Sequence, residues 1–221
     1  MKKDFDVLQK CVLFQGFTEE ELFASLACLN AREKKLEKGQ CALHAGDEAQ
    51  FVGVVLEGEV QILREDFDGA RSVVGHAEAG QLFAEAFSCA GIAEMPVSVM
   101  AVRPSRVMLV PVQRILTPCS QACGFHSRLI TNLMHVMAQK NLYLHQKVEV
   151  MSQRTTREKL LRYLRTEARR QHSLSFTIPF DRQALADYLG VERSALSAEI
   201  GKMQRDGVIE SKRSWFRLKG E

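Results

Sequence analysis

The sequence predicts an α+β protein in three consecutive parts: an antiparallel β-roll, one long helix and a winged helix-turn-helix. Short apolar segments separated by glycines fill residues 32–111. Two neighbouring apolar columns then recur every seven residues over 122–151, and two short amphipathic helices followed by a hairpin occupy 180–218. Short strands between regular turns are typical of rolls and barrels, and a seven-residue apolar period is typical of a long packed helix.

Residues 5–30, ahead of the roll, are expected to be helical with a turn at Gly16. Thr18 and Glu21 have the spacing of a capping box, in which each side chain accepts the backbone N–H of the other residue. The acidic residues in this first turn also suit the positive end of the helix dipole. The inner stripe of the helix is Leu22, Leu26 and Leu29.

The roll is predicted from its turns and from the strand formers between them. Strand-forming residues are concentrated between Val52 and Leu63, and Glu65 to Gly69 has the composition of a hairpin tip. Val97 to Val110 predicts a strand pair that is broken at Arg103-Pro104-Ser105. Together these segments favour an antiparallel roll.

The long helix carries its two apolar columns side by side. They consist of Leu129, Val136, Tyr143 and Val150, and of Ile130, Met137, Leu144 and Met151. Two columns over about four heptads are wider than packing on one domain requires. We therefore expect one column to pack on the roll and the other on the same helix of a second subunit, giving a homodimer. The alternative is a single helix buried against its own domain.

Residues 180–209 contain the helix-turn-helix. The apolar residues of its two helices are spaced to lie on one buried face of each: Leu185, Ala186 and Leu189, then Leu196, Ile200 and Met203. Gly190, between the helices, supplies the left-handed conformation that ends a helix at little cost. The open side of the second helix is short and polar, as in a recognition helix that enters the DNA major groove.

A predicted hairpin with a basic turn, Ser211 to Ser214, follows the two helices and completes a winged helix. The candidate DNA contacts are Arg182 and Gln183 on the first helix, Arg193, Ser194, Ser197 and Ala198 on the second, and Lys212 and Arg213 on the wing. Arg193 is placed to donate two parallel hydrogen bonds to guanine, and Ala198 to contact a thymine methyl. The wing cations suit phosphates. The alternative is a small helical domain that contacts proteins instead of DNA.

Charge is divided unevenly along the 221 residues. From Ser152 onward, 15 Lys and Arg stand against 9 Asp and Glu, whereas the preceding part has 15 against 18. The basic part is the one with the helix-turn-helix, as a phosphate-binding surface requires. The first residues lack the apolar run of a signal peptide, and no apolar stretch approaches a membrane span. The six scattered cysteines are typical of reduced thiols. We therefore expect a cytoplasmic protein that does not enter the membrane.

The order of roll, long helix and winged helix-turn-helix resembles the CRP/FNR family of bacterial transcription regulators, which includes the cyclic-AMP receptor protein. The motifs that carry the resemblance are Lys38-Gly39, Gly46-Asp47, Glu57-Gly58-Glu59, the run from Gly80 to Glu85, and the run from Val191 to Ser197. The resemblance spans essentially the whole chain. It implies a cyclic-nucleotide-binding-like sensor and a ligand-responsive homodimer on a palindromic operator of double-stranded DNA. It also implies that Arg182 touches a phosphate, and that RNA polymerase is a partner if the protein activates transcription.

The resemblance also implies an effector site of Glu85, Met95, Lys140 and Asn141. Glu85 matches the family residue that holds the ribose of a cyclic nucleotide, although Ala84 replaces the usual preceding glycine. Met95 and the proline after it occupy the place of the phosphate-clamping Arg-Ser pair and provide no charged donor. We therefore expect a member that does not bind cyclic AMP and has an unknown small-molecule effector. Lys140 is interpreted either as a contact to an anionic effector or as a snorkelling lysine.

Two other sensor chemistries stay open, an iron–sulfur centre and haem, which would make the protein a redox or gas sensor. Cys119 and Cys123 stand at i, i+4, but a cluster needs four ligands. The candidate haem ligands are His126, His135, His145 or a methionine.

No cofactor, metal site or catalytic residue is predicted. The roll has only His44 and His76, without the clustered ligands of a cupin metal site. There is also no nucleophile–base pair and no phosphate-cradling loop, so an enzyme is not expected. The predicted domains are a sensor roll at 1–121, a dimerisation helix at 122–151 and a DNA-binding domain at 152–221.

Overall fold

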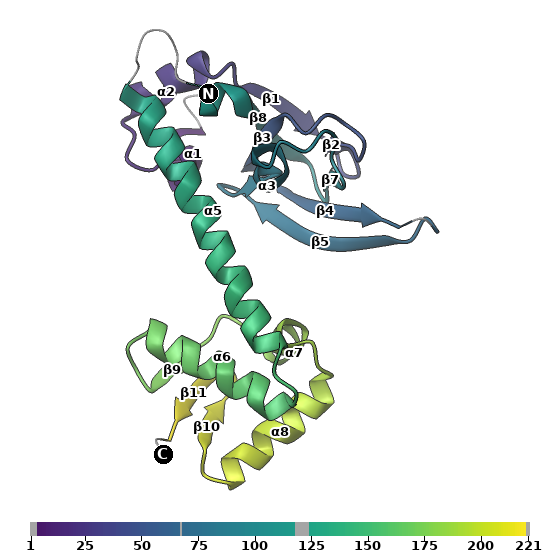
Figure 1. The fold of residues 1–221 in the computed structure, drawn as a ribbon, viewed down its shortest axis with the longest axis vertical. Helices are drawn as coiled ribbons and strands as arrows, with labels where there is room; N and C mark the ends of the chain where they lie inside the picture. Colours follow the sequence, from purple (N-terminus) through teal and green to yellow (C-terminus); the bar gives the residue numbers. More distant parts are fainter. Residues whose placement is uncertain (1–3, 67, 118–123, 220–221) are drawn as a thin grey trace. The chain divides into compact units, whose positions relative to one another are not determined.

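The computed structural model describes residues 4–66, 68–117 and 124–219 (Figure 1). The predicted α+β fold is confirmed, with the roll, the long helix and the winged helix-turn-helix in the expected order. The chain forms two compact units, Met1–Ala138 and Gln139–Glu221. The division falls inside the long helix α5 (Gly124–Met151), so each unit contains one end of that helix. The bounds of the three predicted domains stay predictions.

The roll consists of two four-stranded antiparallel sheets. The first contains, in spatial order, β1 (Arg32–Leu36), β8 (Ser105–Pro111), β3 (Phe51–Glu57) and β6 (Leu82–Phe83). The second contains β2 (Cys41–Leu43), β7 (Ser98–Ala101), β4 (Glu59–Glu65) and β5 (Arg71–Glu78). The break predicted at Arg103-Pro104-Ser105 separates β7 from β8, and β4 and β5 form the predicted long hairpin.

Strand β3 shows why both faces of the first sheet are apolar. Its alternate residues Val52 and Val54 join a core with the N-terminal helices, whereas Val55 joins a second core shared by the two sheets. Because successive side chains point to opposite faces of a strand, one run of valines supplies both cores. Gly53 leaves room for the ring of Phe83, which a Cβ at that position would approach to 2.0 Å.

Helical segments cover the outer face of the first sheet. They are α1 (Phe5–Lys10), the 3-10 turn η2 (Val12–Phe14), α2 (Glu19–Cys28) and the short α4 (Val112–Leu116). The predicted capping box is confirmed, since Glu21 N donates to Thr18 Oγ1 at 3.2 Å and Thr18 N donates to Glu21 Oε2 at 3.1 Å. Residues 5–30 are thus helical on both sides of a turn at Gly16, as predicted.

The C-terminal unit packs α6 (Thr156–Arg170) on α7 (Arg182–Leu189) and α8 (Arg193–Arg205). A three-stranded sheet of β9 (Ser175–Thr177), β10 (Ile209–Lys212) and β11 (Trp215–Leu218) completes it, with β11 in the middle. Helix α6 starts at Thr156, because the Thr155 side chain caps it by accepting from the backbone N–H of Glu158.

Candidate DNA interface and sensor site

The two helices of the motif are joined as the sequence predicts. Asp181 caps α7 by accepting from Ala184 N at 2.8 Å, and Gly190 ends it at φ 60°. Val191 N then donates to Ala186 O at 3.0 Å, which fixes the direction of α8. A Cβ at Gly190 would approach Cε of Met151 to 2.7 Å, but this is the flexible end of a side chain, so it is the left-handed backbone that requires glycine here.

Helix α8 buries one side and presents the other to solvent. Leu196, Ile200 and Met203 are at most 4% exposed, as predicted. The four candidate base contacts are all exposed: Arg193, Ser194, Ser197 and Ala198. Among the described residues, the guanidinium of Arg193 has no ion pair. It therefore stands in the first turn of α8 with its donors directed to solvent.

Arg182 also shapes the interface. Its guanidinium lies 5.0 Å above the ring of Phe216, and it donates to Ser211 Oγ, so it fastens α7 to the wing. Burial lowers the pKa of the Arg182 guanidinium from its ordinary value. The neighbouring Gln183 is exposed and donates to Asp187 Oδ1 at 2.8 Å. The sequence did not indicate that Arg182 joins α7 to the wing.

The wing turn is tighter than predicted. Strand β10 extends through Lys212, and only Arg213 and Ser214 connect it to β11. Arg213 adopts φ 53°, and Ser214 Oγ donates to Phe180 O at 2.9 Å. The expected four-residue turn from Ser211 to Ser214 is therefore wrong, but Lys212 and Arg213 are both exposed at the tip.

The sensor candidates in the roll are buried. Glu85 opens the short helix α3 (Glu85–Cys89) and is 2% exposed, and Ala84 before it adopts φ 63°. A left-handed alanine is strained by roughly 1–2 kcal/mol, which explains why a glycine would suit this position. Met95 is also 2% exposed, and its backbone pairs with the turn at 46–47.

Lys140 and Asn141 belong to the other compact unit and are exposed on α5. The four predicted effector residues are therefore not assembled within one unit. Arg106 does not replace the missing phosphate clamp, because it donates to Asp4 at 3.1 Å and to Glu33 at 2.8 Å. Arg103 lies 3.7 Å from Glu59.

Two family models match the chain. The cyclic nucleotide-binding domain matches residues 33–121, and the Crp-like helix-turn-helix domain matches residues 158–219. The chain belongs to the CRP/FNR family of transcription regulators. Members of this family bind DNA through the helix-turn-helix and are not enzymes.

Relatives support the same architecture. The fumarate and nitrate reduction regulatory protein of Escherichia coli K12 is 23% identical over 221 residues, which cover 98% of this chain and 85% of the relative. The catabolite activator protein of Thermus thermophilus superposes with a TM-score of 0.54 at 20% identity, covering 94% of this chain and 93% of its own. The sensor domain of the regulator DNR from Pseudomonas aeruginosa also gives 0.54 at 20% identity, over 70% of this chain and 97% of its own.

This CRP/FNR regulator has thiols and imidazoles in several settings, but its described residues contain no group of three or more His, Cys, Asp or Glu side chains that suits a metal ion. Cys119 and Cys123 lie outside the described residues. Burial raises the pKa of the Cys11 thiol to about 11. His126 is 3% exposed and its Nδ1 has no hydrogen-bond partner, whereas His135 is exposed. No helix in the described ranges is both long and apolar enough to cross a membrane.

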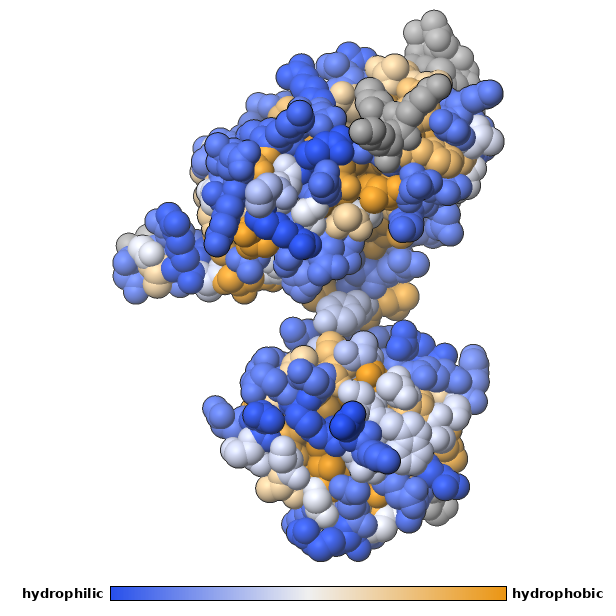
Figure 2. Space-filling model, turned by 180° about the vertical axis from the view of Figure 1, so that it is seen from behind, coloured by the Kyte–Doolittle hydropathy of each residue, from blue (hydrophilic) through white to orange (hydrophobic). Residues whose placement is uncertain are grey.

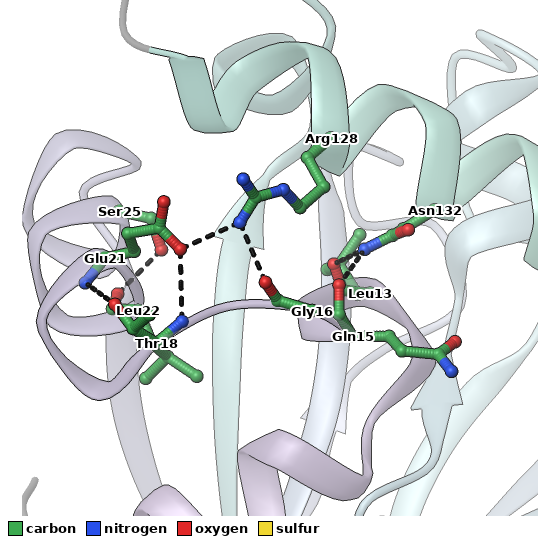
Figure 3. A network of polar contacts seen from close by, with 9 residues as sticks. All are labelled: Leu13, Gln15, Gly16, Thr18, Glu21, Leu22, Ser25, Arg128 and Asn132. Atoms are coloured by element: carbon green, nitrogen blue, oxygen red, sulfur yellow. Dashed lines mark hydrogen bonds and ion pairs between the residues drawn. The ribbon is translucent and has the colours of Figure 1, made fainter.

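Sequence reasoning missed a polar clamp on the first half of α5 (Figure 3). Asn132 is 9% exposed, and its Nδ2 donates to Leu13 O at 3.0 Å and to Gln15 O at 2.9 Å. Arg128 Nη1 donates to Gly16 O and to Glu21 Oε2, both at 2.8 Å. These two residues, four apart on one helix face, fix α5 to the N-terminal helices. Arg128 and Asn132 stand four residues apart, each next to a buried leucine, Leu129 or Leu133. This spacing was the sequence feature from which the contact to the N-terminal helices could have been predicted.

Proposed function

We propose that the protein is an effector-gated transcription regulator that acts as a homodimer on a palindromic operator. The supporting observation is that α5 presents an apolar seam to solvent. The seam consists of Met134, Met137, Leu144, Val148 and Met151, and its exposed fractions reach 66% at Met134 and 65% at Val148. These residues follow one another at three-, four- or seven-residue steps, so they lie along one side of the helix.

A second copy of α5 is the occupant that fits this seam. Large apolar side chains repeated along one side of a helix match the same side of an identical helix, as in a coiled coil. Asn141 stands within the seam and is exposed. A single polar residue in such a seam selects the register and the number of helices. The predicted dimerisation thus has a defined surface on this chain.

The DNA contacts are proposed with separate roles. Arg193 reads guanine, and Ser194, Ser197 and Ala198 contact the neighbouring base edges in the major groove. Lys212 and Arg213, at the tip of the wing, contact phosphates of the DNA backbone. Arg182 contacts a further phosphate from the start of α7. Gln183, at the start of α7, is proposed as a further contact to the DNA. A dimer presents two such surfaces to half-sites about one DNA turn apart.

The effector is proposed to act through α5 by shifting the population between conformations that do and do not fit the operator. Met95 and the exposed Pro96 occupy the place of a phosphate clamp without a charged donor, so cyclic AMP is not the expected ligand. Glu85 is the candidate polar contact in the roll, and Lys140 and Asn141 are candidates on α5. The protein is expected to act in the cytoplasm and, as an activator, to contact RNA polymerase.

Two measurements test this proposal. Selection from random duplexes should enrich an inverted repeat whose half-sites are one turn apart, and enrichment of a single half-site would refute the dimeric operator. Native mass spectrometry of protein purified from its own host should show a dimer and any retained ligand. The retained mass should disappear in Lys140→Met but persist in Gln139→Met. Its persistence in both variants would refute the Lys140 contact.

A further inference from the structure

The C-terminal unit has a groove that takes no part in the proposed DNA contacts. It is a hollow of about 840 Å³ between α6, the loop at 171–174, the turn after α8 and the end of β11. Residues that characterise it are Arg157, Leu161, Arg165, Arg169, Leu174 and Lys219. A second hollow of about 600 Å³ shares Leu174 and Lys219 with it and extends to Trp215 and Arg217. We refer to the two together as the α6 groove.

Apolar side chains form much of its lining. Leu161, Val208 and Leu218 lie along it half-buried, and Leu174 is 57% exposed. Figure 2 shows orange apolar residues reaching the surface among blue hydrophilic ones on the C-terminal unit. Leu174 thus extends the apolar lining to the surface, and contiguous apolar surface with a polar rim is typical of interaction sites.

The loop that carries Leu174 is rigidly held. Ser173 N donates to Ala168 O at 3.0 Å, and Leu218 N donates to Leu174 O at 2.8 Å. The buried carboxylate of Glu167 accepts from Gln171, whose amide also reaches Thr177 O. The exposed leucine is therefore displayed by a fixed backbone, so a partner would not bear the entropy of ordering the loop.

The charge of the groove is positive. Its charged lining comprises Arg157, Arg165, Arg169, Arg217 and Lys219 against Asp206 and Glu210, and His172 also lines it. Arg157 is neutralised by Asp206 at 2.7 Å, and Lys219 is paired with Glu210 at 2.8 Å. Within the described part of the chain, Arg169 has no ion pair. A binding segment therefore meets an excess of positive charge beside apolar surface.

We propose that the α6 groove docks an acidic amphipathic helix of a partner protein. Such a helix offers leucine-like side chains to Leu161 and Leu174 and carboxylates to Arg165 and Arg169. The two hollows share lining residues and continue from α6 to β11, which favours an extended segment as the occupant. A DNA backbone would satisfy the cations but would leave the apolar lining exposed. None of the eight candidate DNA contacts lines the groove, so the two surfaces can be occupied independently.

The test uses the full-length protein and a fluorescein-labelled peptide with leucines at i, i+3, i+4 and i+7 and glutamates elsewhere. Fluorescence anisotropy should show binding to the wild type. Arg169→Glu and Leu174→Ser should each weaken it by about tenfold, which is about 1.4 kcal/mol. Lys202→Glu, an exposed site on α8 outside the groove, changes net charge equally and should alter binding less than about twofold. A peptide of the same composition with its leucines scattered should bind weakly.

Circular dichroism first establishes that both groove variants are folded, which is expected because both substituted side chains are exposed. Equal peptide binding by wild type and both variants would overturn the proposal, as would equal binding of the two peptides. If Arg169→Glu weakens binding to random duplex DNA more than Lys202→Glu does, while the peptide fails to bind, the groove is a phosphate surface and the proposal is wrong.

Discussion

The substitution Leu144→Glu should separate the proposed dimer while leaving each protomer folded. Leu144 is 57% exposed in the protomer. Full burial of a leucine is worth roughly 1.5–3 kcal/mol, so covering the remaining surface gives about 1–1.5 kcal/mol per copy, or about 2–3 kcal/mol per dimer. Two facing carboxylates about 8 Å apart add repulsion of about 2 kcal/mol at an effective dielectric constant near 20. The sum, about 4–5 kcal/mol, corresponds to a dissociation constant about three orders of magnitude higher.

Sedimentation velocity over a concentration series measures this shift directly. The control is Gln146→Glu, which adds the same charge two residues later, about 200° around the helix from Leu144. Gln146 is exposed, and its substitution should leave the dimer within about threefold of the wild type. If Leu144→Glu dimerises as tightly as Gln146→Glu, the seam on α5 is not the dimer interface. Operator binding by Leu144→Glu should fall in parallel, because a monomer contacts one half-site only.

Three further predictions concern DNA, packing and pH. Arg193→Ala should weaken operator binding by about 1–3 kcal/mol and relax the preference for particular bases. Lys212→Ala should weaken binding to all sequences equally and lower the slope of log affinity against log salt concentration by about one. Mobility-shift titrations over randomised operators distinguish the two effects. Asn132→Ala leaves the carbonyls of Leu13 and Gln15 without their hydrogen-bond donor. It should lower the free energy of unfolding by about 2–4 kcal/mol in urea titrations. The control Thr131→Ala, at an exposed neighbouring position, should change this free energy by less than about 0.5 kcal/mol. Arg106 holds the pKa of Glu33 below its ordinary 4.5 by hydrogen bonding, so this stabilisation is present above that value and is lost as pH falls through the lower folded pKa. Arg106→Gln should therefore flatten the loss of stability as pH falls from 7 to below 4.5, and an unchanged slope would contradict the pairing.

The helix-turn-helix could be predicted from the sequence because each of its steps depends on local chemistry. Gly190 ends one helix, Asp181 caps it, and the spacing of Leu196, Ile200 and Met203 defines the buried side of the next. The capping box at Thr18 was equally readable. In each of these cases the interacting residues lie within a few positions of one another. Their spacing in the sequence therefore predicts the contact.

Contacts between distant residues could not be predicted in this way. Asn132 meets Leu13 across 119 residues, and Arg106 meets Asp4 across 102. On the sequence alone, Asn132 is a polar residue in a helix, and its burial depends on the segment that packs against it. The exposure of Leu174 could not be predicted either. It follows a helix in an ordinary polar loop, and its exposure depends on how the unit folds.

The packing of α5 at its two ends offers a physical route for the proposed effect of an effector on DNA binding. At its beginning, Leu129 is buried in the core with the N-terminal helices and Asn132 holds their carbonyls. At its end, Val150 is buried in the core of the C-terminal unit and Met151 touches Gly190 at the turn between α7 and α8. Each end of α5 is therefore packed in the core of a different unit. Because an α-helix is stiff along its axis, a rotation or axial shift imposed at one end changes the packing at the other. The seam between these ends is where a second subunit would restrict such movements, which links dimerisation to the response.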